Sequence, residues 1–199
     1  LFISYKNMNT KTDIQILMPA FNKAEFVEQA IDSVLMQNTC YKYELIISDD
    51  NSKDGTLEIC KSYQEQYPEI IRLFKNDINL GCLGNTIKCY KKISVDYFTV
   101  LDPDDYWLNS DLIENALNEL KKNKEISVYF ENTFVVSNKS KSYLNAKSRM
   151  TSLDEKYTLF GHTSASFFKN SFSKEIITFL ESKVGTKDEQ LFEGDTFRN

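Results

Sequence analysis

The sequence has little proline, glycine and histidine. Three prolines and six glycines in 199 residues exclude collagen-like and low-complexity chains. No apolar run approaches the roughly 20 residues that a membrane helix needs, and the mean hydropathy is −0.43. Acidic residues outnumber basic ones by 29 to 24, whereas proteins that bind nucleic acid usually carry a basic excess. We therefore expect a globular chain with one core, no transmembrane segment and no nucleic-acid partner.

Cysteine and histidine are too sparse for the sites they usually build. Cys40, Cys60, Cys82 and Cys89 form no Cys-x-x-Cys pair, and the single histidine, His162, lies far downstream. This spacing does not indicate a zinc site, and no serine or cysteine has a histidine base nearby in sequence. With no signal peptide visible in these residues, we expect free thiols and a cytoplasmic location.

The common phosphate-binding signatures are also missing. No Gly-x-Gly-x-x-Gly follows the first expected strand, which disfavours a dinucleotide site of the Rossmann type. No Gly-x-x-x-x-Gly-Lys-Ser/Thr occurs, which excludes a P-loop.

Short apolar runs alternate with amphipathic helical patterns along most of the chain. Strands are expected at 14–18 (closed by Pro19), 43–48, 70–75, 97–101, 126–136 and 163–169. Helices are expected at 27–35, 55–67, 86–93, after the N-cap Ser110, and at 171–180. The stretch 137–149 is expected to be a polar loop. This alternation predicts βαβ units and a mainly parallel sheet.

Ligands of such sheets bind outside the carboxyl ends of the strands. Four segments are expected there: 19–22, 49–52, 79–81 and 102–105. Each alone is ordinary turn sequence. Together they gather the carboxylates of Asp49, Asp50, Asp102, Asp104 and Asp105, whose mutual repulsion a cation would relieve. The pattern predicts a Mg²⁺ or Mn²⁺ ion shared with the phosphates of a nucleotide diphosphate.

The same segments carry a family resemblance over roughly the first two-thirds of the chain. They read Met-Pro-Ala-Phe-Asn-Lys at 18–23, Ala-Ile-Asp-Ser-Val-Leu-Met-Gln at 30–37, Glu-Leu-Ile-Ile-Ser-Asp-Asp-Asn-Ser-Lys-Asp-Gly-Thr at 44–56 and Leu-Asp-Pro-Asp-Asp-Tyr-Trp at 101–107. In this order and spacing the chain resembles family 2 glycosyltransferases. The resemblance implies the GT-A fold, a Rossmann-like α/β architecture with helices on both faces of the sheet.

The resemblance also implies roles for individual residues. The positions matching nucleotide-sugar contacts are Pro19, Phe21, Asn22, Asp49, Asp50, Gly81, Asn85, Asp102 and Asp104. Phe21 would border the base, Asp50 would hydrogen-bond it, and Asp104 or Asp105 of the DxD motif would hold the metal. The loop around Gly81 and Asn85 lacks the basic residue that the family usually has before its last asparagine.

The last third matches a subgroup of this family less closely. His162 falls in a His-Thr-Ser segment and is expected to contact the donor, with a structural hydrogen-bonded histidine as the alternative. Asp195 matches the catalytic base, with Glu193 and Asp188 as fallbacks and a solvated acidic helix start as the alternative. The basic residues Lys139, Lys141, Lys147 and Arg149 either neutralise the diphosphate or belong to a solvated loop.

The resulting prediction is a metal-dependent inverting glycosyltransferase with a nucleotide-sugar donor, a UDP-sugar being favoured. The acceptor would be a carbohydrate or lipid-linked hydroxyl in cell-surface polysaccharide synthesis, with peripheral association at the inner face of the membrane left open. One alternative is a non-catalytic GT-A-like binding module. Another is a haloacid-dehalogenase-type phosphatase, whose acidic motif would have to lie on the first strand.

The expected organisation is a single GT-A domain behind a short extension. Residues 1–11 form the extension, in which Met8 is a plausible natural start. Residues 12–199 form the domain, with a nucleotide-sugar-binding part at 12–136 and an acceptor and catalytic-base part at 137–199. Because family members usually continue past the base helix, we expect this chain to lack a C-terminal part.

Overall fold

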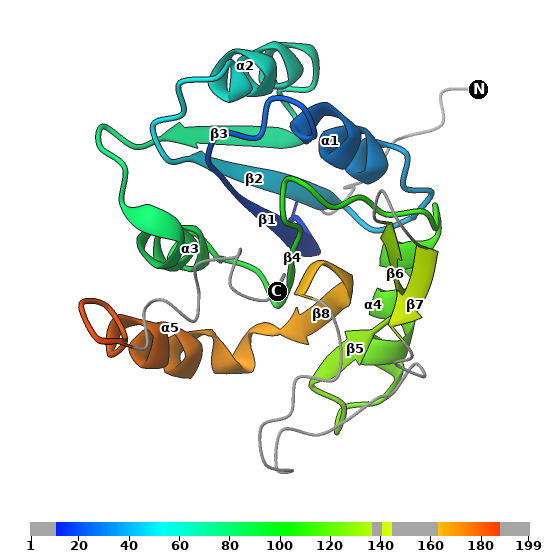
Figure 1. The fold of residues 1–199 in the computed structure, drawn as a ribbon. Coiled ribbons are helices and arrows are strands. Elements are labelled where there is room, and N and C mark those ends of the chain that lie inside the picture. The colour runs from blue at the N-terminus through cyan, green and yellow to red at the C-terminus, as the bar shows by residue number, and fades with distance from the viewer. Residues whose placement is uncertain (1–10, 137–140, 145–162, 188–199) are drawn as a thin grey trace.

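The computed structural model describes residues 11–136, 141–144 and 163–187. Its centre is a six-stranded sheet in the order β3-β2-β1-β4-β8-β5 (Figure 1). The strands are β1 (Ile14–Ala20), β2 (Tyr43–Asp49), β3 (Ile71–Lys75), β4 (Tyr97–Val100), β5 (Val128–Phe130) and β8 (Ser166–Lys169). β1 to β4 are mutually parallel, and only β8 runs antiparallel to its neighbours β4 and β5. The predicted mainly parallel α/β sheet is confirmed.

Helices cover both faces of this sheet (Figure 1). They are α1 (Val27–Leu35), α2 (Thr56–Gln66), α3 (Gly81–Tyr90), α4 (Leu112–Lys122) and α5 (Ser173–Glu181). Because side chains alternate along a strand, Ile16 and Met18 of β1 pack in one core with α1, α2 and α4. Leu17 points the other way, into a second core with α3 and α5. Central strands that are buried on both faces are the reason for the continuous apolar runs in the sequence.

Two helices do not begin where the sequence predicts. The helix expected at 86–93 begins five residues earlier, as α3 at Gly81, because Gly81 adopts φ +76° and the Asn79 side chain accepts a hydrogen bond from its N–H at 2.8 Å. Ser110 is not the N-cap of α4. That position belongs to Asp111, whose side chain forms no capping hydrogen bond.

The chain after α4 also differs from the expectation. The strand expected at 126–136 divides into β5 and β6 (Thr133–Val136), because β5 pairs with β8 in the main sheet whereas β6 pairs with β7 (Lys141–Leu144) in a separate ribbon. β7 lies in the stretch expected to be a loop. The strand expected at 163–169 begins with a 3₁₀ turn, η1 (Thr163–Ala165), and a second turn, η2 (Asn170–Phe172), precedes α5.

Pro19 does not end the first strand, which continues to Ala20. Pairing of β1 with β4 stops at Leu17, whereas pairing with β2 continues to Ala20. Pro19 therefore lies beyond the β4 ladder, where a missing N–H is tolerated.

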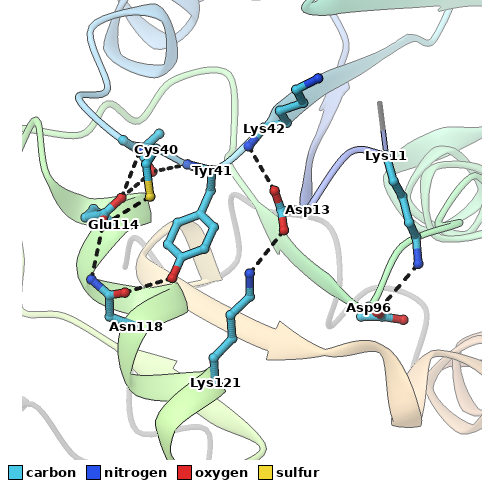
Figure 2. A network of polar contacts seen from close by, with 10 residues as sticks. Lys11, Asp13, Cys40, Tyr41, Lys42, Asp96, Glu114, Asn118 and Lys121 are labelled. Carbon is cyan, nitrogen blue, oxygen red and sulfur yellow. Dashed lines mark hydrogen bonds and ion pairs between the residues drawn. The ribbon is translucent and has the colours of Figure 1, made fainter. Parts of the chain in front are cut away.

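The amino-terminal edge of the sheet is held by a polar network (Figure 2). Asp13 accepts hydrogen bonds from the Lys42 N–H at 3.1 Å and from the Lys121 ammonium at 3.0 Å. Glu114 of α4 accepts from the Thr39 hydroxyl at 2.8 Å and from the Cys40 N–H at 3.0 Å. These hydrogen bonds stabilise the charged carboxylate and so lower the pKa of Glu114, with the bond from Thr39 contributing most. These contacts fix the ends of β1, β2 and α4 at the edge opposite to the candidate site.

Candidate functional site

The carboxyl ends of the parallel strands meet at one edge of the sheet. The Asp50 N–H donates to the Ala20 carbonyl at 2.8 Å, the Asn76 N–H to the Asp49 carbonyl at 2.8 Å, and the Leu101 N–H to the Leu17 carbonyl at 2.9 Å. The loops that follow β1, β2, β3 and β4 therefore lie side by side. This is the edge at which the sequence predicts a ligand.

The loops after β1 and β2 interlock through asparagine. Asn22 and Asn51 have φ of 50° and 62°, a left-handed conformation that asparagine tolerates better than most residues. The Asn22 N–H donates to the Ser52 hydroxyl at 3.0 Å, and the Asn22 Oδ1 accepts from the Lys53 N–H at 2.9 Å. Phe21 stays 43% exposed beside this turn, so its ring has a face for a planar ligand.

Asp54 ties the same two loops together. Its carboxylate accepts from the Ala24 N–H at 3.0 Å and from the Thr56 hydroxyl at 2.6 Å. Desolvation acts to raise the pKa of Asp54, but these hydrogen bonds to the charged form outweigh it, so the pKa is lowered.

Asp49 and Asp50 are almost completely buried, at 0% and 1% exposure. Asp50 Oδ1 accepts from Asn76 Nδ2 at 2.7 Å and from the Leu80 N–H at 2.9 Å. Asp50 thereby shapes the loop after β3. Asp49 Oδ2 accepts from the Ser52 N–H at 3.1 Å, while its Oδ1 has no hydrogen-bond partner among the described residues.

Asn85 is buried in α3 and bonds to the end of β2. Its Oδ1 accepts from the Ser48 hydroxyl at 2.7 Å, and its Nδ2 donates to the Ser48 carbonyl at 2.8 Å. Asn85 therefore fixes α3 to the sheet, and its direct contact with a donor stays a prediction. Gly81, at the start of α3, supplies the positive φ that the loop needs.

The acidic loop after β4 is held from two sides. On one side, the Lys23 ammonium lies 2.8 Å from Asp104 Oδ2. On the other side, the Ser164 hydroxyl donates to Asp105 Oδ2 at 2.6 Å and accepts from the Asp102 N–H at 3.1 Å. The Trp107 indole N–H donates to the Ser164 carbonyl at 2.6 Å.

Ser164 can reach this loop because β8 is antiparallel to β4. Residues just before β8 therefore lie at the carboxyl edge of β4. Neither Ser164 nor the ion pair of Lys23 was assigned a role from the sequence, although both residues belong to the matched motifs. The only sign of these contacts in the sequence is that Lys23 and Ser164 are polar residues within the segments that resemble the family. His162, Asp188, Glu193 and Asp195, as well as Lys139, Lys147 and Arg149, lie outside the described residues.

The carboxylates of the acidic loop suit a hard divalent cation in donor type. Asp104 is 26% exposed, so a ligand can reach it, and it already faces a cationic group. Within 11–136, 141–144 and 163–187, no group of three metal-ligating side chains occurs. Mg²⁺ is commonly held by one or two carboxylates together with substrate phosphates.

Comparisons with known proteins agree with this architecture. Residues 15–177 match the family model for glycosyl transferase family 2. A protein of Mycoplasma pneumoniae named as an uncharacterized glycosyltransferase is 30% identical over 149 residues, which are 67% of this chain and 50% of that protein. The minor teichoic acid biosynthesis protein GgaB of Bacillus subtilis is 28% identical over 188 residues, 89% of this chain and 21% of GgaB.

Solved glycosyltransferases share the fold. Residues 1–349 of S. aureus TarS in complex with UDP superpose with a TM-score of 0.71 at 17% identity, covering 92% of this chain and 54% of that one. The mannosyltransferase PcManGT of Pyrobaculum calidifontis, in complex with GDP-Man and Mn²⁺, gives a TM-score of 0.60 at 16% identity, covering 86% and 50%. The predicted GT-A fold is confirmed.

The chain spans about half the length of the first curated relatives that it matches. In the part that the structure describes, no helix is long and apolar enough to cross a bilayer. The phosphatase alternative needs its acidic motif on the first strand, whereas Asp102 and Asp104 follow β4 within the matched region. The chain belongs to glycosyl transferase family 2.

Proposed function

We propose that this chain is the donor-binding part of a metal-dependent, inverting glycosyltransferase that uses a nucleotide-diphosphate sugar, with a UDP-sugar favoured. The observation that carries the proposal is the loop after β4, where Asp104 and Asp105 stand at the edge that also presents Phe21. The printed titles of two structural neighbours, with UDP in one and GDP-Man and Mn²⁺ in the other, support this class of donor.

The acceptor is proposed to be a carbohydrate or lipid-linked hydroxyl in the synthesis of a cell-surface polymer. The name of GgaB, a teichoic acid biosynthesis protein, supports this, although this chain corresponds to only 21% of GgaB. We propose a cytoplasmic protein that can associate with the inner face of the membrane. The free cysteines among the described residues fit a reducing compartment.

In the proposed reaction, Phe21 stacks on the base. Asp50, predicted to accept a hydrogen bond from the base, acts indirectly, because its buried carboxylate already accepts from Asn76 and Leu80 and holds the loop after β3. Asp102 binds the ribose, and Asp104 and Asp105 would hold Mg²⁺ or Mn²⁺. The ion, when bound, would offset negative charge on the departing diphosphate. Asp195 accepts the proton of the acceptor hydroxyl as that oxygen attacks the anomeric carbon from the side opposite to the diphosphate. The reaction therefore inverts the configuration at that carbon.

Calorimetry with UDP tests the donor site. We expect wild-type protein to bind UDP in the presence of Mn²⁺ and Asp104→Ala to lose the Mn²⁺-dependent part of this binding. Asp96→Ala is the matched control, because the Asp96 side chain is 80% exposed in its pair with Lys11 at the opposite edge. Equal Mn²⁺-dependent binding by wild type and Asp104→Ala would contradict the metal assignment.

A non-catalytic binding module is the alternative to an enzyme. Incubation with a labelled UDP-sugar distinguishes them, because only an enzyme releases UDP by transfer or hydrolysis. Binding without any release of UDP would favour the module.

A further inference from the structure

Lys23 joins the loop after β1 to the acidic loop after β4. Its ammonium lies 2.8 Å from Asp104 Oδ2, and the two side chains are 33% and 26% exposed. Its backbone is fixed independently, because the Lys23 N–H donates to the Thr56 hydroxyl at 2.7 Å. Replacing the side chain should therefore leave this turn in place.

The lysine pairs with one of the carboxylates that are proposed to hold the divalent cation. Asp102, Asp104 and Asp105 place three carboxyl groups within four positions, and such like charges require a compensating cation or donor. Ser164 supplies a donor for Asp105, and Lys23 supplies the cation for Asp104. An ammonium and a divalent ion repel each other, so they compete for the same Asp104 oxygen.

We propose that Lys23 exchanges partners during donor binding. It pairs with Asp104 when the donor is absent and with the donor's diphosphate when the donor is present, which frees Asp104 for the divalent ion. The inference rests on the proposed function and adds a positioning role for Lys23 to it. Because a nucleotide that draws Lys23 away improves metal binding, the metal must improve nucleotide binding by the same factor. Lys23 thus makes the two ligands bind cooperatively.

The test is the affinity for Mn²⁺, measured by calorimetry with and without UDP, for wild type, Lys23→Met and Lys23→Arg. We expect Lys23→Met to bind Mn²⁺ alone about three- to fivefold more tightly than wild type, the factor expected for loss of a partly exposed ion pair. The gain in Mn²⁺ affinity caused by UDP should fall by at least the same factor. Lys23→Arg keeps the positive charge and should behave like wild type.

Lys53→Met is the matched control. Lys53 lies in the adjoining loop, but its ammonium donates to Asn51 Oδ1 at 2.7 Å rather than to the acidic loop. It should leave both Mn²⁺ affinities unchanged, and thermal denaturation should show that all variants fold. Unchanged or weaker Mn²⁺ binding by Lys23→Met in the absence of UDP would overturn the inference about Lys23 but not the proposed function. A wild-type protein that binds no UDP with Mn²⁺ would overturn the proposed function, and the inference with it.

Discussion

The Ser164 hydroxyl donates to Asp105 Oδ2 over 2.6 Å and joins two residues that are 59 positions apart. It is the point at which the last third of the chain meets the acidic loop. The same hydroxyl accepts from the Asp102 N–H, so one side chain restrains both ends of the Asp102–Asp105 segment. The acidic loop is thus shaped by a residue from outside 12–136, the part predicted to bind the nucleotide-sugar.

Ser164→Ala should weaken both the fold and the site. A hydrogen bond to a charged group contributes about 1.5–3 kcal/mol, so we expect a loss of about 2 kcal/mol in the free energy of unfolding. Asp105 is a proposed metal ligand, and loss of a side chain that orients such a ligand commonly weakens metal binding about tenfold or more. UDP binding in the presence of Mn²⁺ should therefore weaken about tenfold. Denaturant titration and calorimetry measure these effects. Thr163→Ala, at an exposed neighbouring position, should change neither quantity. Wild-type binding by Ser164→Ala would argue against the restraint.

Asp195→Asn tests the proposed catalytic base. An amide cannot accept the acceptor's proton, so transfer should be lost while UDP binding is kept. Product formation from a UDP-sugar measures transfer, and calorimetry measures binding. Glu193→Gln and Asp188→Asn are the comparison variants and should retain transfer. A transfer rate of Asp195→Asn equal to that of wild type would disprove the assignment.

Asp54 should make the loops of the site sensitive to acid. Its pKa is lowered in the folded protein, so the unfolded chain binds more protons near pH 4 and stability rises with pH there. This contribution is complete above the unfolded pKa of about 3.9 and is lost as the pH falls through the lower, folded value. Asp54→Asn removes the titrating group and should reduce the loss of stability between about pH 5 and pH 3. Parallel curves of thermal midpoint against pH for the two proteins would contradict this.

The four cysteines should divide into two classes on alkylation. Burial raises the pKa of the Cys60 and Cys89 thiols to about 12, and the thiolate is the reactive form. Cys40 and Cys82 are exposed. At pH 8, iodoacetamide should modify Cys40 and Cys82 in the folded protein and all four cysteines after denaturation, as peptide mass spectrometry can show. Early labelling of Cys60 or Cys89 would mean that the core opens.

The order and type of the central elements could be predicted because their signals are local. Apolar runs such as Ile14–Met18 must be buried on both faces, and helix 27–35 shows its buried face at the helical spacing. Parallel strands joined by helices must bring their carboxyl ends to one edge, which is why Asp49 and Asp102 could be placed near each other. The same argument led to the acidic residues proposed for the candidate site, whose role stays a prediction.

The tertiary structure alone decided the features that depend on partners distant in sequence. β6 and β7 exist because they pair with each other, and the polar stretch around β7 gives no local sign of a strand. The antiparallel placement of β8 brings Ser164 to Asp105, and the ends of β1 and β4 bring Lys23 to Asp104. The sequence by itself therefore determined which polar segments gather at the carboxyl edge of the sheet. Only folding decided which side chain restrains each carboxylate, because those contacts join residues up to 81 positions apart.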